Sequence, residues 1–204
     1  GSLYFIMDPS YSENIVKDKI SNNSILLTLG GSDHNNLIFS ILNVLIENSN
    51  VKEVIIITSK STGYFNELQN IVNTQSKNII IYNDVPSLQP YWCKCYLAIT
   101  AGGNTIFDRS ASGIAGATIC QLPRQMEIAD KFELLGVNKN IGYGPDMKNE
   151  VLMKLINDFI IDTNEHIQQH DKCRKIVTGN GTKLFINELY KLVGNKNELW
   201  WTRK

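Results

Sequence analysis

Two stretches of this sequence place a pair of glycines between an apolar run and a run with helical spacing. One reads SILLTLGGSDHNN and contains Gly30 and Gly31, and the other reads LAITAGGNTIFD and contains Gly102 and Gly103. Each pattern is typical of a buried strand, a tight turn and a helix. Glycine lets the backbone approach a ligand closely, and the free N–H groups that begin a helix favour an anion. One such pair is more often a plain turn, but two at one edge of a parallel sheet favour a site for two phosphates, or for a phosphate and a sugar.

Known phosphate-binding motifs narrow the choice of ligand. The segment LGGSDHN lacks the third glycine of a dinucleotide fingerprint, and no G-x-x-x-x-G-K-[ST] run is present. A nucleotide-sugar site needs less: backbone N–H groups for a diphosphate, a carboxylate for ribose hydroxyls, and amide or hydroxyl groups for the sugar. Asp108 falls in the first turn of the helix after the second glycine pair, where its carboxylate could accept both ribose hydroxyls. A plain helix-dipole partner is the alternative for this residue.

Other residue types that could do chemistry give weaker patterns. His166 and His170 are four residues apart and could share a helix face as metal ligands, but no HExxH motif or third ligand accompanies them. We therefore expect an exposed polar face there, and neither a metal nor a cofactor. We expect reduced, unligated cysteines, because a CxC spacing is not a standard structural zinc pair; the four are Cys93, Cys95, Cys120 and Cys173.

Length, composition and charge limit the classes to which this protein can belong. The chain has 204 residues, 43% of them hydrophobic, and its 20 basic side chains balance 20 acidic ones. This composition predicts one ordinary globular core and carries no electrostatic footprint for nucleic acid or an anionic membrane. No apolar run has the length of a membrane span and no signal-peptide pattern begins the chain, so we expect a cytoplasmic protein.

Apolar periodicity predicts alternating strands and helices. We expect strands at 24–29, 54–58, 78–82, 97–99 and 117–121, with a weaker one at 140–143, and helices beginning near 13, 36, 61, 105 and 126. The loop LPRQ would precede the helix near 126, and the chain would be helical from Lys148 onwards. This order predicts an α/β fold with a doubly wound, Rossmann-like parallel sheet. The apolar segments LYFIM and Trp200-Trp201 are expected to cover neighbouring surfaces.

The segments TLGGSDHNN, ITAGGNTIFD and ICQLPRQ, with Ala129 and Gly136, resemble the C-terminal half of a known family. That family comprises the UDP-sugar hydrolase of pseudaminic acid biosynthesis and its relatives called spore coat polysaccharide biosynthesis protein G. It has the GT-B fold and is similar, more distantly, to the glycosyltransferase that makes lipid II. The resemblance runs from Gly1 to about Tyr143. It implies an interdomain linker with a short helix at 1–21, a UDP-binding domain at 22–193, a tail at 194–204, and an N-terminal domain that is missing from this chain.

The resemblance also implies roles for individual residues. In the first loop, Gly30, Gly31 and Ser32 would approach the diphosphate, and Asp33 and Asn36 would shape the loop. The second loop would bind phosphate through Gly102, Gly103, Asn104 and Thr105. The backbone near Val85 would meet uracil, Asp108 would bind ribose, and Gln125 would contact the phosphate or the sugar. The family usually has glutamate where Asp108 stands, and Cys95-Tyr96 replaces a small-acidic pair. Its general base, a histidine of the N-terminal domain, has no counterpart here. His34 would lie on the leaving-group side, so we expect a solvated or capping role for it and no catalytic residue in this chain.

The implied reaction is attack of water at the anomeric carbon of a UDP-linked diacetamido-trideoxy-altropyranose, with UDP as leaving group. A related glycosyltransferase would use the same UDP half with an acceptor hydroxyl in place of water. The contribution of this half would be to neutralise the charge that grows on the diphosphate. The alternative is a non-catalytic Rossmann-like module that docks to a partner protein, which the shorter carboxylate of Asp108 and the apolar LYFIM and Trp200-Trp201 segments favour.

Overall fold

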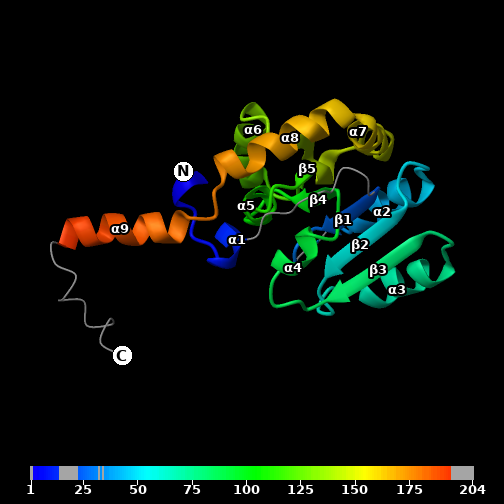
Figure 1. Ribbon diagram of the computed structural model, residues 1–204. Coiled ribbons are helices and arrows are strands. Elements are labelled where there is room, and N and C mark those ends of the chain that lie inside the picture. The colour runs from blue at the N-terminus through cyan, green and yellow to red at the C-terminus, as the bar shows by residue number, and fades with distance from the viewer. Residues whose placement is uncertain (1, 14–22, 32, 34, 194–204) are drawn as a thin grey trace.

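The computed structural model describes residues 2–13, 23–31, 33 and 35–193. In this part of the chain six parallel strands form one sheet in the order β3-β2-β1-β4-β5-β6, with helices on both faces (Figure 1). This arrangement confirms the predicted α/β, doubly wound parallel fold. The strands are β1 Ser24–Thr28, β2 Glu53–Thr58, β3 Asn78–Asn83, β4 Leu97–Ala101, β5 Ala115–Cys120 and β6 Lys139–Tyr143.

The helices divide between the two faces of the sheet. On one face pack α2 Leu37–Glu47, α3 Phe65–Thr74 and α7 Asn149–Ile161, and on the other pack α4 Gln89–Trp92, α5 Thr105–Ala111 and α6 Pro123–Leu134. Helix α8, Thr163–Ile176, packs against β5 and α5. The remaining short or terminal elements are η1 Ser2–Tyr4, α1 Ser10–Glu13, η2 Gly144–Asp146 and α9 Gly181–Val193.

Central strands are apolar throughout because both of their faces are covered. Every residue of β1, β4 and β5 is buried, and so are the β-branched residues Val54 to Ile57 of β2. A continuous apolar run is what a parallel strand between two helical layers requires, and this is why the sequence predicts these strands well.

Two element boundaries differ from the sequence-based expectation. Helix α6 begins at Pro123 and not near Met126, so the segment LPRQ is the start of the helix and not a loop. Strand β5 begins at Ala115, and Gly116 therefore lies inside the strand. A Cβ at Gly116 would stand 2.5 Å from the carbonyl oxygen of Ala98 and 2.7 Å from Cδ of Arg109. Glycine is needed there for close packing.

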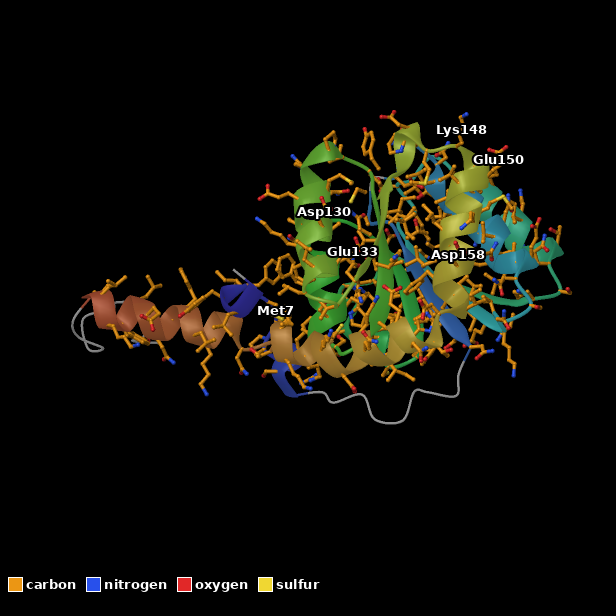
Figure 2. The ribbon with its side chains drawn as sticks, turned by 90° about the horizontal axis from the view of Figure 1, so that it is seen from above. Met7, Asp130, Glu133, Lys148, Glu150 and Asp158 are labelled. Carbon is orange, nitrogen blue, oxygen red and sulfur yellow. The ribbon has the colours of Figure 1, made fainter. Side chains whose placement is uncertain are left out.

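The apolar LYFIM segment packs partly on the domain itself. The ring of Phe5 stacks on Phe107 of α5 with centroids 3.9 Å apart. Met7 is buried, and its backbone N–H and C=O both hydrogen-bond to Oγ1 of Thr182, at 3.1 and 2.8 Å. Figure 2 shows Met7 where the N-terminal segment meets α8 and α9. Leu3 and Ile6 stay exposed.

Helix α9 leaves the body of the domain, and its start lies beside the N-terminal segment (Figure 1). The large apolar side chains of this helix are not buried: Phe185 and Leu189 are exposed, and Leu192 is 82% exposed. The expected helix at 13–20 falls almost entirely outside the described residues, as do Trp200 and Trp201. None of the helices in the described ranges has the length and apolar character that a membrane crossing needs.

The two histidines of α8 do not form the exposed polar face that we expected. His166 is 1% exposed, and His170 is half-buried. Tyr96 lies against both imidazole rings, with centroid distances of 5.7 Å to His166 and 5.1 Å to His170. Tyr96 and the two histidines therefore pack as one cluster between the start of β4 and helix α8.

Candidate functional site

The two glycine pairs follow neighbouring strands of the sheet. β1 and β4 are adjacent and parallel, and Thr28 is the Cα partner of Thr100. The helix after β1 packs on one face of the sheet and the helix after β4 on the other, so the strand order reverses between these two strands. Such a switch point opens a crevice at the carboxyl ends of the strands, where open α/β sheets bind ligands. The sequence-based placement of both glycine loops at one edge is correct.

The first loop has free space around its two glycines, but the backbone N–H groups at the start of the following helix are already hydrogen-bonded. Gly30 has φ of 78°, and a Cβ at Gly30 or Gly31 would meet nothing within 4 Å. The buried carboxylate of Asp33 accepts hydrogen bonds from the backbone N–H groups of Leu37 at 3.1 Å and Ile38 at 2.9 Å. The expectation that this helix offers free N–H groups to a ligand is therefore wrong at α2, because the chain supplies its own anion there.

Asn36 lies at the end of the first loop. It adopts a left-handed conformation, with φ of 52°, directly before α2. Left-handed backbone is tolerated best by glycine and asparagine, so Asn36 shapes the turn into the helix. Ser32 and His34 lie outside the described residues.

The second loop assigns different roles to its two glycines. A Cβ at Gly102 would lie 2.8 Å from Sγ of Cys120 and 2.8 Å from Cβ of Gln125, so this glycine is a packing requirement. Gly103 has open space, since a Cβ there would meet only Nε2 of Gln125, at 3.9 Å. No carbonyl among the described residues accepts from the N–H groups of Asn104 or Thr105, which follow it. The backbone from Gly103 to Thr105 is thus the part of this loop that can donate to a ligand.

Gln125 is held beside the second loop by its own helix. Its Oε1 accepts hydrogen bonds from the backbone N–H groups of Gln121, at 2.8 Å, and Leu122, at 3.3 Å, which caps the N-terminus of α6. The oxygen of the amide is therefore occupied, while the Nε2 donor lies next to Gly103. This arrangement can direct an amide N–H toward an anion in the crevice.

Gln121 is a residue of this region that sequence reasoning missed. Its Nε2 donates to the carbonyl oxygen of Leu29 at 2.9 Å, which ties the end of β5 to the start of the first glycine loop. Gln121 is 7% exposed. A polar residue directly after a buried strand was the available signal, since such a side chain needs a partner at the sheet edge.

Asp108 lies in the first turn of α5, as predicted, and its carboxylate is half-buried. Burial raises its pKa from 3.8 to about 6. No hydrogen bond to this carboxylate comes from any described residue. A desolvated carboxylate with vacant acceptor positions is suited to ligand hydroxyl groups.

The N-terminal segment reaches the neighbourhood of Asp108 through Tyr11. Burial raises the pKa of the Tyr11 hydroxyl to about 12, and the Asp108 carboxylate adds to the increase. The same hydroxyl accepts a hydrogen bond from Nε1 of Trp92 at 3.4 Å. Val85 packs against the same apolar cluster. Asp108 and Val85, the positions predicted to contact the ribose and the base, therefore both lie beside the apolar cluster that contains Tyr11 and Trp92.

Arg109 is a second residue that sequence reasoning missed. Its guanidinium is fully buried and donates to the carbonyl oxygens of Ile114 at 2.6 Å and Val137 at 2.9 Å, and to Oδ1 of Asn138 at 3.1 Å. These bonds tie α5 to the loops that precede β5 and β6. Arg109 faces the interior, so it positions the helix that carries Asp108 and does not reach the crevice.

The chemistry that these groups provide is anion and hydroxyl binding. Backbone N–H groups and the amide of Gln125 suit phosphate oxygens, and Asp108 suits a diol. Within the described ranges, no group of three or more histidine, cysteine, aspartate or glutamate side chains is placed to hold a metal ion. No disulfide joins the four cysteines, and Cys95, Cys120 and Cys173 are buried.

Comparison with curated proteins gives two distant relatives, and no protein-family model matches the chain. The chain is 24% identical over 201 residues to spore coat polysaccharide biosynthesis protein SpsG of Bacillus subtilis, which covers 94% of the chain and 58% of SpsG. It is 29% identical over 118 residues to the uncharacterized protein MJ1062 of Methanocaldococcus jannaschii, covering 57% of the chain and 24% of that protein. The chain thus spans little more than half of SpsG and about a quarter of MJ1062.

Solved structures show the same fold. MurG of Acinetobacter baumannii superposes with a TM-score of 0.68 at 19% identity, over 89% of this chain and 52% of MurG. The spinosyn rhamnosyltransferase SpnG in complex with spinosyn aglycone superposes with a TM-score of 0.65 at 17% identity, over 94% of this chain and 49% of SpnG. The chain therefore has the Rossmann-like α/β fold of the C-terminal half of GT-B glycosyltransferases.

Proposed function

We propose that this chain is the UDP-binding half of a nucleotide-sugar enzyme in bacterial surface-glycan or nonulosonic acid biosynthesis. The observation that carries the proposal is the pairing of Thr28 with Thr100, which brings two open glycine loops to one switch point of the sheet. Weak similarity to SpsG over nearly the whole chain and the GT-B type of fold support it. A solved complex of SpnG contains thymidine diphosphate, a nucleotide of the same general class.

Each group of the crevice has a role in this proposal. The N–H groups of Gly30, Gly31 and Gly103 to Thr105 donate to the diphosphate, and Nε2 of Gln125 donates to the phosphate or sugar side. Asp108 accepts the ribose hydroxyls, and the backbone near Val85 meets the uracil. Asp33 and Gly102 act on the loops themselves, because Asp33 caps α2 and Gly102 permits close packing.

The catalytic base is assigned to an N-terminal domain that precedes this chain. We place the interdomain linker at 1–21, the nucleotide domain at 22–193 and a tail at 194–204. Donors around the diphosphate stabilise UDP as it leaves the anomeric carbon, and the attacking water or acceptor hydroxyl is activated from the other domain. The enzyme is a UDP-sugar hydrolase similar to the one in pseudaminic acid synthesis or a related glycosyltransferase, and the two differ in whether water or an acceptor hydroxyl attacks.

Calorimetric titration of the chain with UDP, UMP, CDP and a UDP-N-acetylhexosamine tests the proposal. We expect UDP to bind more tightly than UMP or CDP, and Asp108→Ala to weaken every uridine ligand. Thermal shift at high ligand concentration detects weak binding, because stabilisation grows as the logarithm of one plus the ratio of ligand concentration to Kd. Absence of binding by all four ligands would refute the UDP site. Hydrolysis of the UDP-sugar by this chain alone would refute the assignment of the base to another domain.

The second candidate function is a non-catalytic docking module. The exposed apolar side chains of α9, together with Leu3 and Ile6, are the observation that favours it, since a monomeric surface seldom exposes a contiguous apolar stripe. The two proposals differ in ligand response: a docking module would bind a protein through α9 and show no stabilisation by uridine nucleotides.

A further inference from the structure

Asp84 directly follows β3 and has an unusual backbone conformation. Its φ is 49°, in the left-handed region, and in the described part of the chain Asn36 is the only other non-glycine residue with positive φ. This conformation costs energy in any residue with a Cβ, although aspartate and asparagine tolerate it better than most. It persists where the surrounding contacts hold it in place.

Hydrogen bonds from the end of β2 provide these contacts. The backbone N–H of Asp84 donates to the carbonyl oxygen of Thr58 at 3.1 Å, which continues the ladder between β2 and β3. Oδ1 of Asp84 accepts from Oγ of Ser59 at 2.6 Å and from the backbone N–H of Lys60 at 3.2 Å. Asp84 is therefore tied to the loop after β2 through both its backbone and its side chain.

The residue whose position this fixes is Val85. It is half-buried, and its backbone N–H and C=O groups make no hydrogen bond to any residue that the structure describes. Pro86 follows, and a residue before proline is restricted to extended backbone. Asp84 sets the direction in which the chain leaves the sheet, and Pro86 limits the rotation of Val85 itself. The vacant donor and acceptor of Val85 are thus held as one pair at the carboxyl edge of the sheet.

The chain after Val85 lies beside the group that we assign to the ribose. Burial, with a smaller contribution from the Asp108 carboxylate, raises the pKa of Tyr11 to about 12, and a hydrogen bond with Ser87 opposes the increase. Ser87 is two residues beyond Val85. Asp108 and this segment therefore both border Tyr11, so a nucleoside whose ribose is held by Asp108 has its base within reach of Val85.

An oriented N–H and C=O pair distinguishes uracil from cytosine. Uracil presents O4 as an acceptor and N3–H as a donor, which match the N–H and C=O of one peptide residue. Cytosine presents an amino group as a donor and N3 as an acceptor, so each contact would join two donors or two acceptors. This discrimination requires a fixed orientation, because a peptide pair that can rotate or shift can bind either base.

We propose that Asp84 is a positioning residue for base selectivity: its left-handed backbone and its bonds to Ser59 and Lys60 orient the peptide groups of Val85 toward uracil. The inference rests on the proposed UDP site and adds the residues that make this site selective for uridine over cytidine. Asp84 does not itself contact the nucleotide.

Calorimetric titration with UDP, CDP and inorganic pyrophosphate tests this role, because pyrophosphate has no base and reports on the glycine loops alone. Asp84→Ala removes the anchoring carboxylate and the tolerance of left-handed backbone. Asp84→Asn is its matched control, since asparagine loses the same charge but keeps an Oδ1 acceptor and that tolerance. We expect the unaltered chain and Asp84→Asn to bind UDP at least about tenfold more tightly than CDP. In Asp84→Ala this ratio should fall to about one, with pyrophosphate affinity equal to that of Asp84→Asn.

Ser59→Ala is a second variant, which keeps the test open if Asp84→Ala does not fold. It removes the 2.6 Å hydrogen bond and leaves the backbone of Asp84 unaltered, so its ratio should lie between those of the unaltered chain and Asp84→Ala. A UDP preference that persists unchanged in both variants would overturn this inference and leave the UDP site intact. Equal weakening of UDP, CDP and pyrophosphate in Asp84→Ala would also overturn it, because that result indicates a general effect on the fold.

Two results with the unaltered chain separate this inference from the proposed function. Equal affinity for UDP and CDP, with pyrophosphate still bound, would overturn the base contact at Val85 and the role of Asp84, and the phosphate loops would stand. Absence of binding by UDP, CDP and pyrophosphate would refute the proposed function itself, and this inference with it.

Discussion

Thr28 of β1 and Thr100 of β4 are Cα partners in adjacent parallel strands. Each is followed two residues later by a glycine pair, so the two loops leave the sheet at the same level. Because the helices after these strands pack on opposite faces, the space between the loops is not closed by either helix. This pairing is the geometric basis of the proposed diphosphate site, which uses both loops.

The two glycines of the second loop are expected to respond differently to alanine. Gly102→Ala should lower the free energy of unfolding by about 1–3 kcal/mol, because its methyl group would overlap Cys120 and Gln125. Gly103→Ala has room and should fold normally, while its methyl group narrows the approach of a phosphate. Urea denaturation and UDP titration of both variants measure the two effects. Equal stability of the two variants would contradict this division of roles.

The side-chain amide of Gln125 caps α6 with its oxygen, and we propose that its nitrogen binds the ligand, so substitutions can test the two roles separately. Gln125→Glu keeps an oxygen that accepts from Gln121 and Leu122, so we expect its stability to be unchanged. It replaces the Nε2 donor beside Gly103 by a carboxylate, so UDP affinity should fall by at least about tenfold. Gln125→Met removes both functions and should also lose about 1 kcal/mol of stability. Chemical denaturation and calorimetry together distinguish these outcomes, and unchanged UDP affinity in Gln125→Glu would remove Gln125 from the site.

Stability should depend on pH through Asp108. Its pKa is about 6 in the folded chain, raised by burial from 3.8, so between these values the folded state binds more protons than the unfolded state. The free energy of unfolding contributed by this group is therefore highest in acid, and it decreases as pH rises from about 4 to about 6. Asp108→Asn should remove this component of the slope. Urea denaturation across this range measures it, with the slope of the unaltered chain as reference.

Ligand affinity should show the opposite dependence on pH. The ionised form of Asp108 accepts the ribose hydroxyls best, so the affinity advantage of the unaltered chain over Asp108→Asn should grow as pH rises through about 6. The effect of ionisation of the UDP phosphate on affinity is the same for both proteins, so it cancels when the binding free energies of the two are subtracted at each pH. An advantage that does not change with pH would exclude Asp108 from contact with the nucleotide.

Arg109 is expected to matter for stability alone. Arg109→Ala removes the guanidinium donor from two buried carbonyl oxygens, which keep only the weak Cys173 thiol near them, and it creates a cavity, so the loss should be about 3 kcal/mol or more. Oδ1 of Asn138 keeps its hydrogen bond from Thr118. Arg124→Ala is the matched control, because Arg124 is exposed on α6 and should change stability by less than about 0.5 kcal/mol. UDP affinity of the folded fraction of Arg109→Ala, measured well below its melting temperature, should stay close to that of the unaltered chain.

Most of the fold could be predicted because its signals are local. Runs such as Val54 to Ile57 are typical of strands covered on both faces, and the glycines after β1 and β4 mark the turns. The start of α6 was missed although Pro123 and Gln125 are signals of a helix N-terminus, because the same residues also occur in loops.

The burial of α8 and the roles of single glycines depend on tertiary contacts. Nothing in the local sequence indicates that His166 packs against Tyr96, which is seventy positions earlier. Gly102 and Gly103 are adjacent and identical in type, and only the positions of Cys120 and Gln125 distinguish them. Likewise, the Asp33 carboxylate takes the N–H groups of α2 through a loop conformation that the residue types alone do not specify.

UDP is expected to bind between the two glycine loops, and backbone amide chemical shifts recorded by NMR during a UDP titration locate its binding site residue by residue. We expect saturable shifts at Gly30, Gly31, Gly103 and Asn104, with smaller effects near Val85 and Asp108. UMP should shift the phosphate loops less than UDP does. Shifts confined to α9 or to other surfaces, or no saturable shifts at these amides, would show that UDP does not bind between the two loops.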